Sequence, residues 1–330
     1  MTSKQKFTVA VTRRIPDAGL DLLRESTTMR LWDEDLPPTP EQLIDLLHGC
    51  DGALTLLTER IDGDLLDRVP SIRVVSNLAV GYDNIDVPAA TARGVLVCNT
   101  PDVLTNATAD HTWALLLAAA RRIPESIEFV RAGNWKTWDP LLLLGQEVSG
   151  ATIGIAGLGR IGKQVAKRAR GFEMRILAFD PFEDAVFAAE HEVTYVPLDR
   201  LLEESDFVTL HVALTEDTRH LIGAPELERM KSTAILVNAS RGPVVDTDAL
   251  VTALRDGDIL GAALDVTDPE PLPADHPLVS MANCIVVPHT ASATVQTRDR
   301  MAKLAGRNLL AGLKGERPPA SVNADDVLPN

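Results

Sequence analysis

The chain has 330 residues, 45% of them hydrophobic and 24% charged, which is long enough and apolar enough for two domains with cores of their own. A net charge of −15 and an aromatic content of 4% argue against a nucleic-acid partner, because phosphates attract clustered cations and bases stack on rings. The longest apolar run, residues 113–120, is far shorter than the roughly 20 residues of a membrane span. We therefore expect neither nucleic acid nor membrane as a partner.

The cysteines and the N-terminal segment bear on the compartment. Cys50, Cys98 and Cys284 are isolated, with no CxxC spacing and no histidine at ligand spacing, so we expect no disulfide framework and no metal site. The first residues lack the apolar region of a secretory signal. Both features predict a cytoplasmic protein.

The first hundred residues alternate short apolar runs with helical patterns, which is typical of βα units around a parallel sheet. Between the first two strands, Thr39, Pro40 and Gln42 form a capping box that predicts a helix start, and Gly49 suits its end. The predicted strands cover residues 7–12, 52–57, 73–78 and 95–99.

Two helices, over 102–122 and 124–135, separate this region from a second series of strands. Seven strands follow, at 151–157, 175–179, 193–196, 207–211, 234–239, 259–265 and 284–288. A helix over 292–315 comes last, and we expect the polar tail after Gly315 to be loose. The pattern predicts the α/β class, with two Rossmann-like or flavodoxin-like parallel-sheet domains and a cleft between them.

Gly157, Gly159 and Gly162 form a G-x-G-x-x-G turn between a strand and an amphipathic helix, the setting of a dinucleotide pyrophosphate site. Asp180 ends the next strand, where an acid accepts from ribose hydroxyls and repels a 2′-phosphate. A structural turn with a surface acid would have the same residues, but strand, helix and acid together favour the cofactor. The sequence therefore predicts NAD(H) in preference to NADP(H).

Polar side chains follow three later strands: Arg241, Glu270 and His289. Since ligands of open α/β sheets bind at the carboxyl ends of strands, these three side chains suit reduction of a 2-keto acid. Arginine binds a carboxylate with two N–H groups, histidine protonates the carbonyl oxygen, and a carboxylate beside the histidine favours imidazolium. Taken singly, each also suits an ordinary surface role.

The remaining histidines are weaker candidates. His111 lies in an apolar helix and is predicted to be a packed core residue. His211, at the carboxyl end of a strand, is a candidate for lining the cofactor crevice.

Over nearly its whole length the chain resembles the D-isomer-specific 2-hydroxyacid dehydrogenases. Within this family it is most similar to the glyoxylate/hydroxypyruvate reductases. The stretches that carry the resemblance are VTRRIP, SNLAVGYDNIDV, NTPDVLTNATA, GIAGLGRIG, NASRGPVVD, LDVTDPEPLPADHPL and PHTASAT. It implies NAD(P)H-dependent reduction of glyoxylate and hydroxypyruvate to glycolate and D-glycerate. Arg241 would bind the substrate carboxylate, Glu270 would orient His289, and His289 would donate the proton.

The resemblance also assigns further site residues. Val80 and Gly81 would bind substrate through backbone N–H groups, with Ser292 and with Trp138 from a neighbouring subunit. The cofactor would be lined by Gly157, Gly159, Arg160, Ile161, Gly162, Asp180, Ala213, Ala239, Asp265 and Ala291. Asp265 would meet the nicotinamide carboxamide, and Ala291 stands where the branch usually has glycine.

Family members have a discontinuous substrate domain, which here implies residues 1–102 plus 292–330, with the dinucleotide domain at 103–291. The resemblance also implies a homodimer formed through the segment around 103–150. For Trp138, ordinary packing in the dimer interface is the alternative to a role in the active site of the neighbouring subunit. Two other functions stay open: a broad D-2-hydroxyacid dehydrogenase, and a non-catalytic NAD(H)-sensing protein like the corepressors of this fold. Glu270 speaks against a formate dehydrogenase, and Val80 against a phosphite dehydrogenase, because those relatives carry Gln and Lys there.

Overall fold

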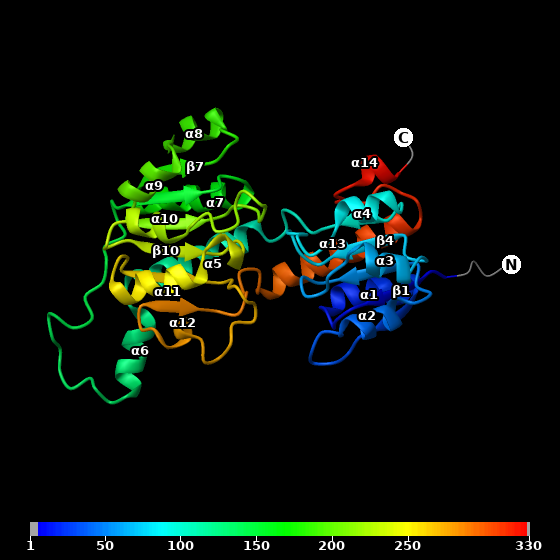
Figure 1. The fold of residues 1–330 in the computed structure, drawn as a ribbon, viewed down its shortest axis with the longest axis horizontal. Helices are drawn as coiled ribbons and strands as arrows, with labels where there is room; N and C mark the ends of the chain where they lie inside the picture. The colour runs from blue at the N-terminus through cyan, green and yellow to red at the C-terminus, as the bar shows by residue number, and fades with distance from the viewer. Residues whose placement is uncertain (1–5, 329–330) are drawn as a thin grey trace. The chain divides into compact units, whose positions relative to one another are not determined.

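The computed structural model describes residues 6–328 and divides the chain into two compact α/β units (Figure 1). The split unit combines the chain up to Leu104 with the chain from Ala293 onward, and the continuous unit is Thr105–Ser292. Each unit is built on a fully parallel sheet, which confirms the predicted fold class.

The sheet of the split unit has five strands in the order β2-β1-β3-β4-β5, the flavodoxin-like order. The strands are β1 (Thr8–Val11), β2 (Thr28–Leu31), β3 (Gly52–Thr55), β4 (Val74–Asn77) and β5 (Leu96–Cys98). The expectation of four strands was wrong, because it missed β2. This edge strand, with the sequence TMRL, has no fully buried residue, so it lacks the apolar run that marked the others.

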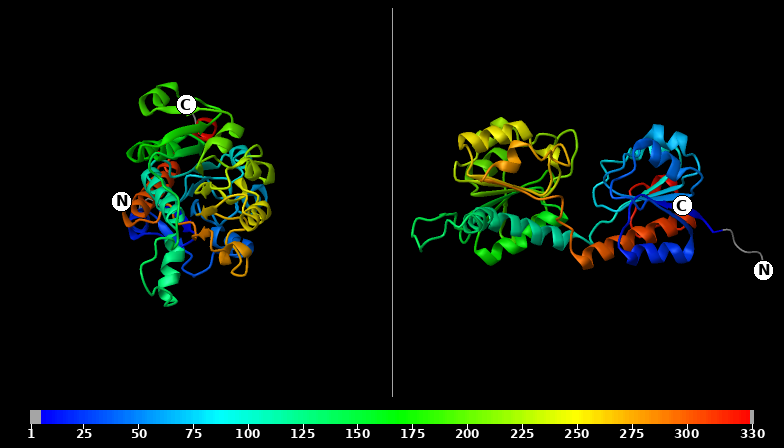
Figure 2. Two further views of the ribbon diagram at one scale, coloured as in Figure 1. Left: turned by 90° about the vertical axis from the view of Figure 1, so that its left-hand side faces the viewer. Right: turned by 90° about the horizontal axis from the view of Figure 1, so that it is seen from below.

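Helices cover both faces of this sheet. They are α1 (Asp17–Ser26), α2 (Pro40–Leu47), α3 (Gly63–Arg68), α4 (Val87–Ala92), α13 (Val295–Leu313) and α14 (Ala324–Val327). The long C-terminal helix α13 packs beside α1 on one face, and the Ser76 hydroxyl of β4 donates to the Ala305 carbonyl of α13 (Figure 2). The predicted capping box of α2 is confirmed, with Gln42 N–H donating to the Thr39 hydroxyl, and Gly49 follows the helix at φ +70°.

The C-terminal tail is docked rather than loose, so that expectation was wrong. Asn323 is 2% exposed, and its side-chain oxygen accepts from the Val97 N–H of β5 at 2.8 Å. Its amide group donates to the Val95 carbonyl and the Thr91 hydroxyl. One buried amide thus satisfies backbone groups that the outermost strand would otherwise leave unpaired.

The sheet of the continuous unit has seven strands in the order β12-β11-β10-β9-β6-β7-β8, and all seven were predicted. The strands are β6 (Thr152–Ala156), β7 (Arg175–Phe179), β8 (Val193–Tyr195), β9 (Phe207–Leu210), β10 (Ile235–Asn238), β11 (Gly261–Leu264) and β12 (Cys284–Val286). The strand order reverses between β6 and β9. In doubly wound folds the ligand binds at this switch point.

The helices of this unit are α5 (Thr105–Ala120), α6 (Ile123–Arg131), α7 (Arg160–Ala169), α8 (Ala185–His191), α9 (Leu198–Glu204), α10 (Ala224–Arg229), α11 (Thr247–Asp256) and α12 (Pro277–Ser280), with short 3-10 turns at Arg170–Phe172 and Gly242–Val244. Helices α5 and α7 cover one face of the sheet and α9, α10 and α11 the other (Figure 2). Helix α6 has no buried residue.

Candidate active site

The three glycines of the turn after β6 have different surroundings. At two of them a side chain would not fit, and at the third the space beside the backbone is open. Gly157 has φ +94°, and a Cβ there would lie 2.6 Å from the His211 carbonyl carbon. A Cβ at Gly162 would lie 2.1 Å from the Gly157 oxygen. A Cβ at Gly159 would meet no atom within 4 Å. Two glycines therefore close the turn, and the third leaves open space beside the backbone, as a bound pyrophosphate requires.

Helix α7 begins directly after this open glycine. Gly159 is its N-cap, and Arg160 and Ile161 are its first two residues. Within residues 6–328 the N-cap supplies no side-chain acceptor to the first N–H groups of this helix. Helix α7 has ten residues, and its N-terminus at the glycine turn favours a bound anion. The glycine turn and α7 together fit a dinucleotide.

Asp180 follows β7 and hydrogen-bonds the glycine turn. Its Oδ2 accepts from the Leu158 N–H at 2.7 Å and its Oδ1 from the Phe182 N–H at 2.8 Å. Each oxygen keeps a further lone pair, so Asp180 can also accept from a hydroxyl. The neighbouring Asp184 is bonded to Lys163 at 2.5 Å, a contact that lowers the pKa of Asp184 and offsets its charge.

His211 follows β9 at the switch point. Its Nε2 lies 2.9 Å from the Thr209 hydroxyl, and within residues 6–328 its buried Nδ1 has no hydrogen-bond partner. Burial lowers the pKa of His211 to about 3, so the ring is neutral. Further along this loop the Ala213 carbonyl accepts from Thr218, while Ala239 lies 8% exposed at the end of β10.

The loop after β10 holds Arg241. Asn238, 1% exposed, donates to the Arg241 carbonyl at 2.9 Å and accepts from the Ser240 N–H, which fixes the turn. A Cβ at Gly242 would lie 1.9 Å from the Thr267 oxygen. Only glycine therefore lets the arginine loop approach the backbone that leads to Glu270.

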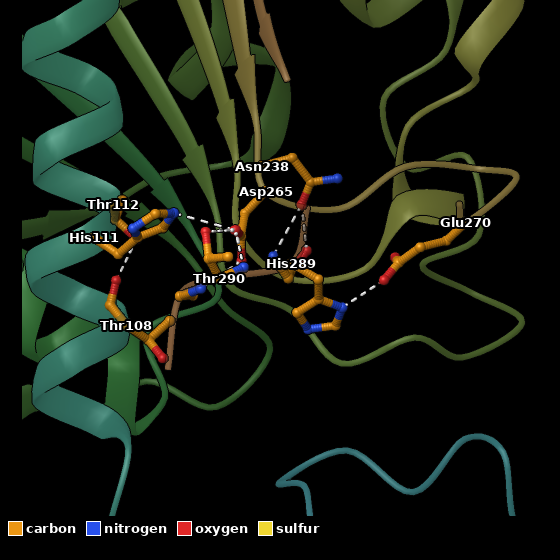
Figure 3. A network of polar contacts seen from close by, with 10 residues as sticks. Thr108, His111, Thr112, Asn238, Asp265, Glu270, His289 and Thr290 are labelled. Atoms are coloured by element: carbon orange, nitrogen blue, oxygen red, sulfur yellow. Dashed lines mark hydrogen bonds and ion pairs between the residues drawn. The ribbon is translucent and has the colours of Figure 1, made fainter. Parts of the chain in front are cut away.

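Glu270 and His289 are in direct contact (Figure 3). His289 Nδ1 lies 2.6 Å from Glu270 Oε1, with the side chains 27% and 43% exposed. Arg241, Glu270 and His289 follow β10, β11 and β12, which are neighbours in the sheet, so their loops start at one edge. The structure thus joins the imidazole to the carboxylate and packs the arginine loop against the glutamate loop.

Asp265, at the end of β11, is buried under the His289 loop. It is 1% exposed, and its carboxylate accepts from the Thr290 N–H at 2.6 Å, the Ala291 N–H at 3.0 Å and His111 Nε2 at 3.1 Å. Burial alone would raise its pKa, but these three hydrogen bonds outweigh burial and lower it. A contact between Asp265 and nicotinamide stays a prediction.

His111 is the residue that sequence reasoning undervalued. It was expected to be packed in the core, yet its ring is bonded to the Asp265 carboxylate across 154 positions of the chain. A titratable ring inside an apolar helix signals that a polar partner is needed. Nothing in the local sequence identifies that partner.

In the split unit, the backbone of Val80 and Gly81 is held by its carbonyl groups. Asn99 donates to the Val80 oxygen at 2.8 Å and Asn77 to the Gly81 oxygen at 3.1 Å. Among residues 6–328, neither the Val80 nor the Gly81 N–H finds an acceptor. Two adjacent N–H groups are therefore available for an anion.

The remaining predicted residues, Ser292 and Trp138 for the substrate and Ala291 for the cofactor, differ in exposure. Ser292 is 9% exposed and Ala291 7%, whereas Trp138 is 79% exposed in the segment after α6. Across the described chain, no group of three or more His, Cys, Asp or Glu side chains could hold a metal ion. Over the same residues, no helix combines the length and apolarity that crossing a bilayer requires.

A doubly wound parallel sheet with a glycine turn at its switch point is the architecture of dinucleotide-binding α/β proteins. The sequence model of the NAD binding domain of D-isomer specific 2-hydroxyacid dehydrogenases matches residues 113–291. The glyoxylate reductase of Korarchaeum cryptofilum is 52% identical over 97% of this chain and 96% of its own. That of Thermococcus gammatolerans is 50% identical over the same shares. The chain belongs to the D-isomer specific 2-hydroxyacid dehydrogenase family.

Solved structures agree with this assignment. The TT0316 protein from Thermus thermophilus superposes with a TM-score of 0.90 at 44% identity, covering 96% of this chain and 99% of its own. An NADPH-dependent glyoxylate/hydroxypyruvate reductase from Sinorhizobium meliloti, in complex with NADP and malonate, has a TM-score of 0.85 at 32% identity and covers 98% of both chains. The resemblance to this family is confirmed at the level of family and fold.

Proposed function

We propose that this protein reduces glyoxylate and hydroxypyruvate to glycolate and D-glycerate with a nicotinamide dinucleotide. The observation that carries the proposal is the 2.6 Å contact between His289 and Glu270, at the end of a sheet whose switch point carries an open glycine turn. Two relatives that are 52% and 50% identical to this chain are glyoxylate reductases, which supports the substrate class.

When bound, the nicotinamide supplies the hydride that reaches the carbonyl carbon. Glu270 accepts from Nδ1 of His289, so the proton on Nε2 is the one directed to the keto oxygen. As that proton leaves, the ring becomes neutral, and Glu270 stabilises the imidazolium that forms before the next turnover. The carbonyl carbon gains the hydride and its oxygen the proton, which balances the reduction.

The substrate carboxylate is assigned to Arg241 and to the N–H groups of Val80 and Gly81. A guanidinium binds a carboxylate with two parallel hydrogen bonds, and unpaired adjacent amides bind an anion. The two amides belong to the proposed substrate domain, predicted as 1–102 plus 292–330, whereas Arg241 belongs to the proposed dinucleotide domain, predicted as 103–291. Asn77 and Asn99 support the assignment of the two amides, because they bond only the carbonyl sides of the two peptides.

NADH is the proposed reductant. Asp180 carries the argument, since its carboxylate would repel a 2′-phosphate beside the ribose. The Sinorhizobium meliloti relative is NADPH-dependent, and Lys163 offsets Asp184 here, so the preference depends on Asp180 alone. Initial rates with NADH and NADPH, for the native protein and Asp180→Ala, test it: a native preference for NADPH overturns the assignment.

We further propose a homodimer formed through α6 and the segment that follows. Large apolar side chains on this segment are exposed, which a lone subunit would leave in water: Ile123, Ile127, Val130, Trp135, Trp138, Leu141 and Leu144. Light scattering of Leu141→Asp/Leu144→Asp against the native protein tests the dimer. Trp138→Ala separates the two roles of Trp138, because a residue of the neighbouring active site would lower kcat while the dimer persists.

The proposed compartment is the cytoplasm, where thiols stay reduced. Cys50, Cys98 and Cys284 are all free, and burial raises the pKa of Cys98 and of Cys284 to about 12, which keeps both protonated. Neither of these thiols therefore competes with His289 for a catalytic role.

The activity itself is tested by following the oxidation of NADH with glyoxylate, hydroxypyruvate and pyruvate in turn. Faster turnover with glyoxylate and hydroxypyruvate than with pyruvate supports the proposed reductase. Comparable turnover with all three indicates a broad D-2-hydroxyacid dehydrogenase. Binding of NADH without turnover of any keto acid would identify a non-catalytic sensor and overturn the proposal.

A further inference from the structure

The backbone around His289 adopts a conformation that its neighbours must hold. His289 has φ 52°, in the left-handed region that disfavours residues with a side chain. Its N–H donates to the Asp265 carbonyl at 2.9 Å and the Val287 carbonyl at 3.0 Å. The next two N–H groups, of Thr290 and Ala291, donate to the two oxygens of the Asp265 carboxylate. Three consecutive amides thus bond to one residue.

Asp265 is in turn held by His111. Nε2 of His111 lies 3.1 Å from Oδ1 of Asp265, and Figure 3 shows the ring reaching from α5 toward the strand end. Helix α5 is anchored in the core by Trp113 and Leu116, which are 5% and 0% exposed. The contacts therefore run from a fixed helix, through one carboxylate, to the loop that carries the catalytic imidazole.

The Asp265 carboxylate has few hydrogen-bond donors, and His111 is one of them. His111 supplies the basic side chain in contact with Asp265, and the other donors are the Thr290 and Ala291 amides and, more distantly, the Thr290 hydroxyl. Without the His111 N–H, a carboxylate that is 1% exposed would lose its side-chain donor from the helix. A buried anion with fewer donors is poorly held.

We propose that His111 is a positioning residue for the reaction: through Asp265 it fixes the backbone of residues 289–291 and so the place of the His289 ring. The inference rests on the proposed function, because it assigns His289 the proton transfer. It is separate from the action of Glu270, which contacts the ring directly. Within residues 6–328, His111 makes no hydrogen bond to the His289 ring or to Glu270.

Three variants separate positioning from general damage to α5. His111→Phe keeps a ring of similar size and removes the donor. His111→Gln restores a donor at about the reach of Nε2. Thr112→Val is the matched control, because it removes a buried hydroxyl bond to the Thr108 carbonyl on the same helix and leaves Asp265 untouched. Should His111→Phe fail to fold, His111→Asn replaces it, since its shorter amide cannot reach the carboxylate.

The first readout is the split between kcat and binding. We expect His111→Phe to lower kcat about tenfold, with KM for glyoxylate and Kd for NADH within about threefold of native, because a displaced proton donor affects the chemical step. His111→Gln should recover most of the loss, and Thr112→Val should keep native kcat. An unchanged kcat in His111→Phe, an equal loss in all three variants, or a loss confined to Kd for NADH would overturn the proposal.

The second readout needs no activity and no cofactor. Hydrogen exchange of the Thr290 and Ala291 amides should be about tenfold faster in His111→Phe than in the native protein, and near native in the other two variants. Native exchange rates in His111→Phe would overturn the proposal. If the native protein turns over no keto acid, the proposed function fails, and this measurement still decides whether His111 holds the loop.

Discussion

Two imidazole–carboxylate pairs lie close to each other in the continuous unit, and they differ in the burial of the carboxylate. His289 and Glu270 are 2.6 Å apart with side chains 27% and 43% exposed, whereas His111 and Asp265 are 3.1 Å apart with side chains 23% and 1% exposed. The first pair is accessible to a substrate and to proton exchange with water. The second is bonded to backbone amides on the inner side of the loop. The comparison teaches that an imidazole–carboxylate pair with an exposed carboxylate suits the proposed proton transfer, whereas a pair with a buried carboxylate suits holding a loop.

The largest effect we expect comes from removing the exposed imidazole. His289→Ala should lower kcat with glyoxylate by about 10³-fold, because no other group is assigned to protonate the keto oxygen. Stopped-flow kinetics measures the rate, and fluorescence titration should give a native Kd for NADH. His48→Ala, at an exposed histidine that ends α2, is the control. A variant of His289 with native turnover would contradict its role.

The next effect concerns the exposed carboxylate. Glu270→Gln should lower kcat by about 10²-fold while KM changes little, since a neutral amide stabilises imidazolium poorly but keeps a similar shape. Steady-state kinetics over a range of glyoxylate concentrations checks this. A change in KM alone would mean that Glu270 contacts the substrate instead of supporting His289.

The buried carboxylate should instead affect stability. Asp265→Asn leaves backbone donors poorly matched, so we expect the free energy of unfolding at neutral pH to fall by about 2 kcal/mol. The pKa of Asp265 is lowered in the folded protein, so its contribution is present above the unfolded value of about 4 and is lost as pH falls through the lower folded value. Urea unfolding at several pH values measures it; a gap between native and variant that widens below pH 4 would be the wrong sign.

The smallest effect sharpens the comparison from the other side. Glu270→Gln should change the free energy of unfolding by no more than about 0.5 kcal/mol, because an exposed ion pair adds little to stability. The same urea experiment at neutral pH checks it. A loss as large as that of Asp265→Asn would remove the distinction between the two pairs.

The sequence predicted the fold wherever local pattern decides it. Continuous apolar runs located eleven of the twelve strands within residues 6–328, and the missed one, β2, has no fully buried residue. The glycine turn could also be predicted, because its three positions are local. The docking of Asn323 on β5 could not, since a single polar residue gives no sign of a strand some 226 positions away.

The site shows the same division. Arg241, Glu270 and His289 were identified by their places after successive strands, since strand ends of a parallel sheet share an edge. The sequence did not predict that Gly242 packs the arginine loop against Thr267, because that contact depends on the loop conformations. Nor did it predict the bond of His111 to Asp265, which only the packing of α5 on the sheet creates.

The most direct test is a crystal structure of the protein with NADH and oxamate, an unreactive analogue of a 2-keto acid. We predict that Arg241 binds the oxamate carboxylate with two hydrogen bonds and that Nε2 of His289 lies within hydrogen-bond distance of its amide carbonyl oxygen, with Glu270 still on Nδ1. Oxamate bound away from His289, or with its carbonyl oxygen facing another group, would contradict the account.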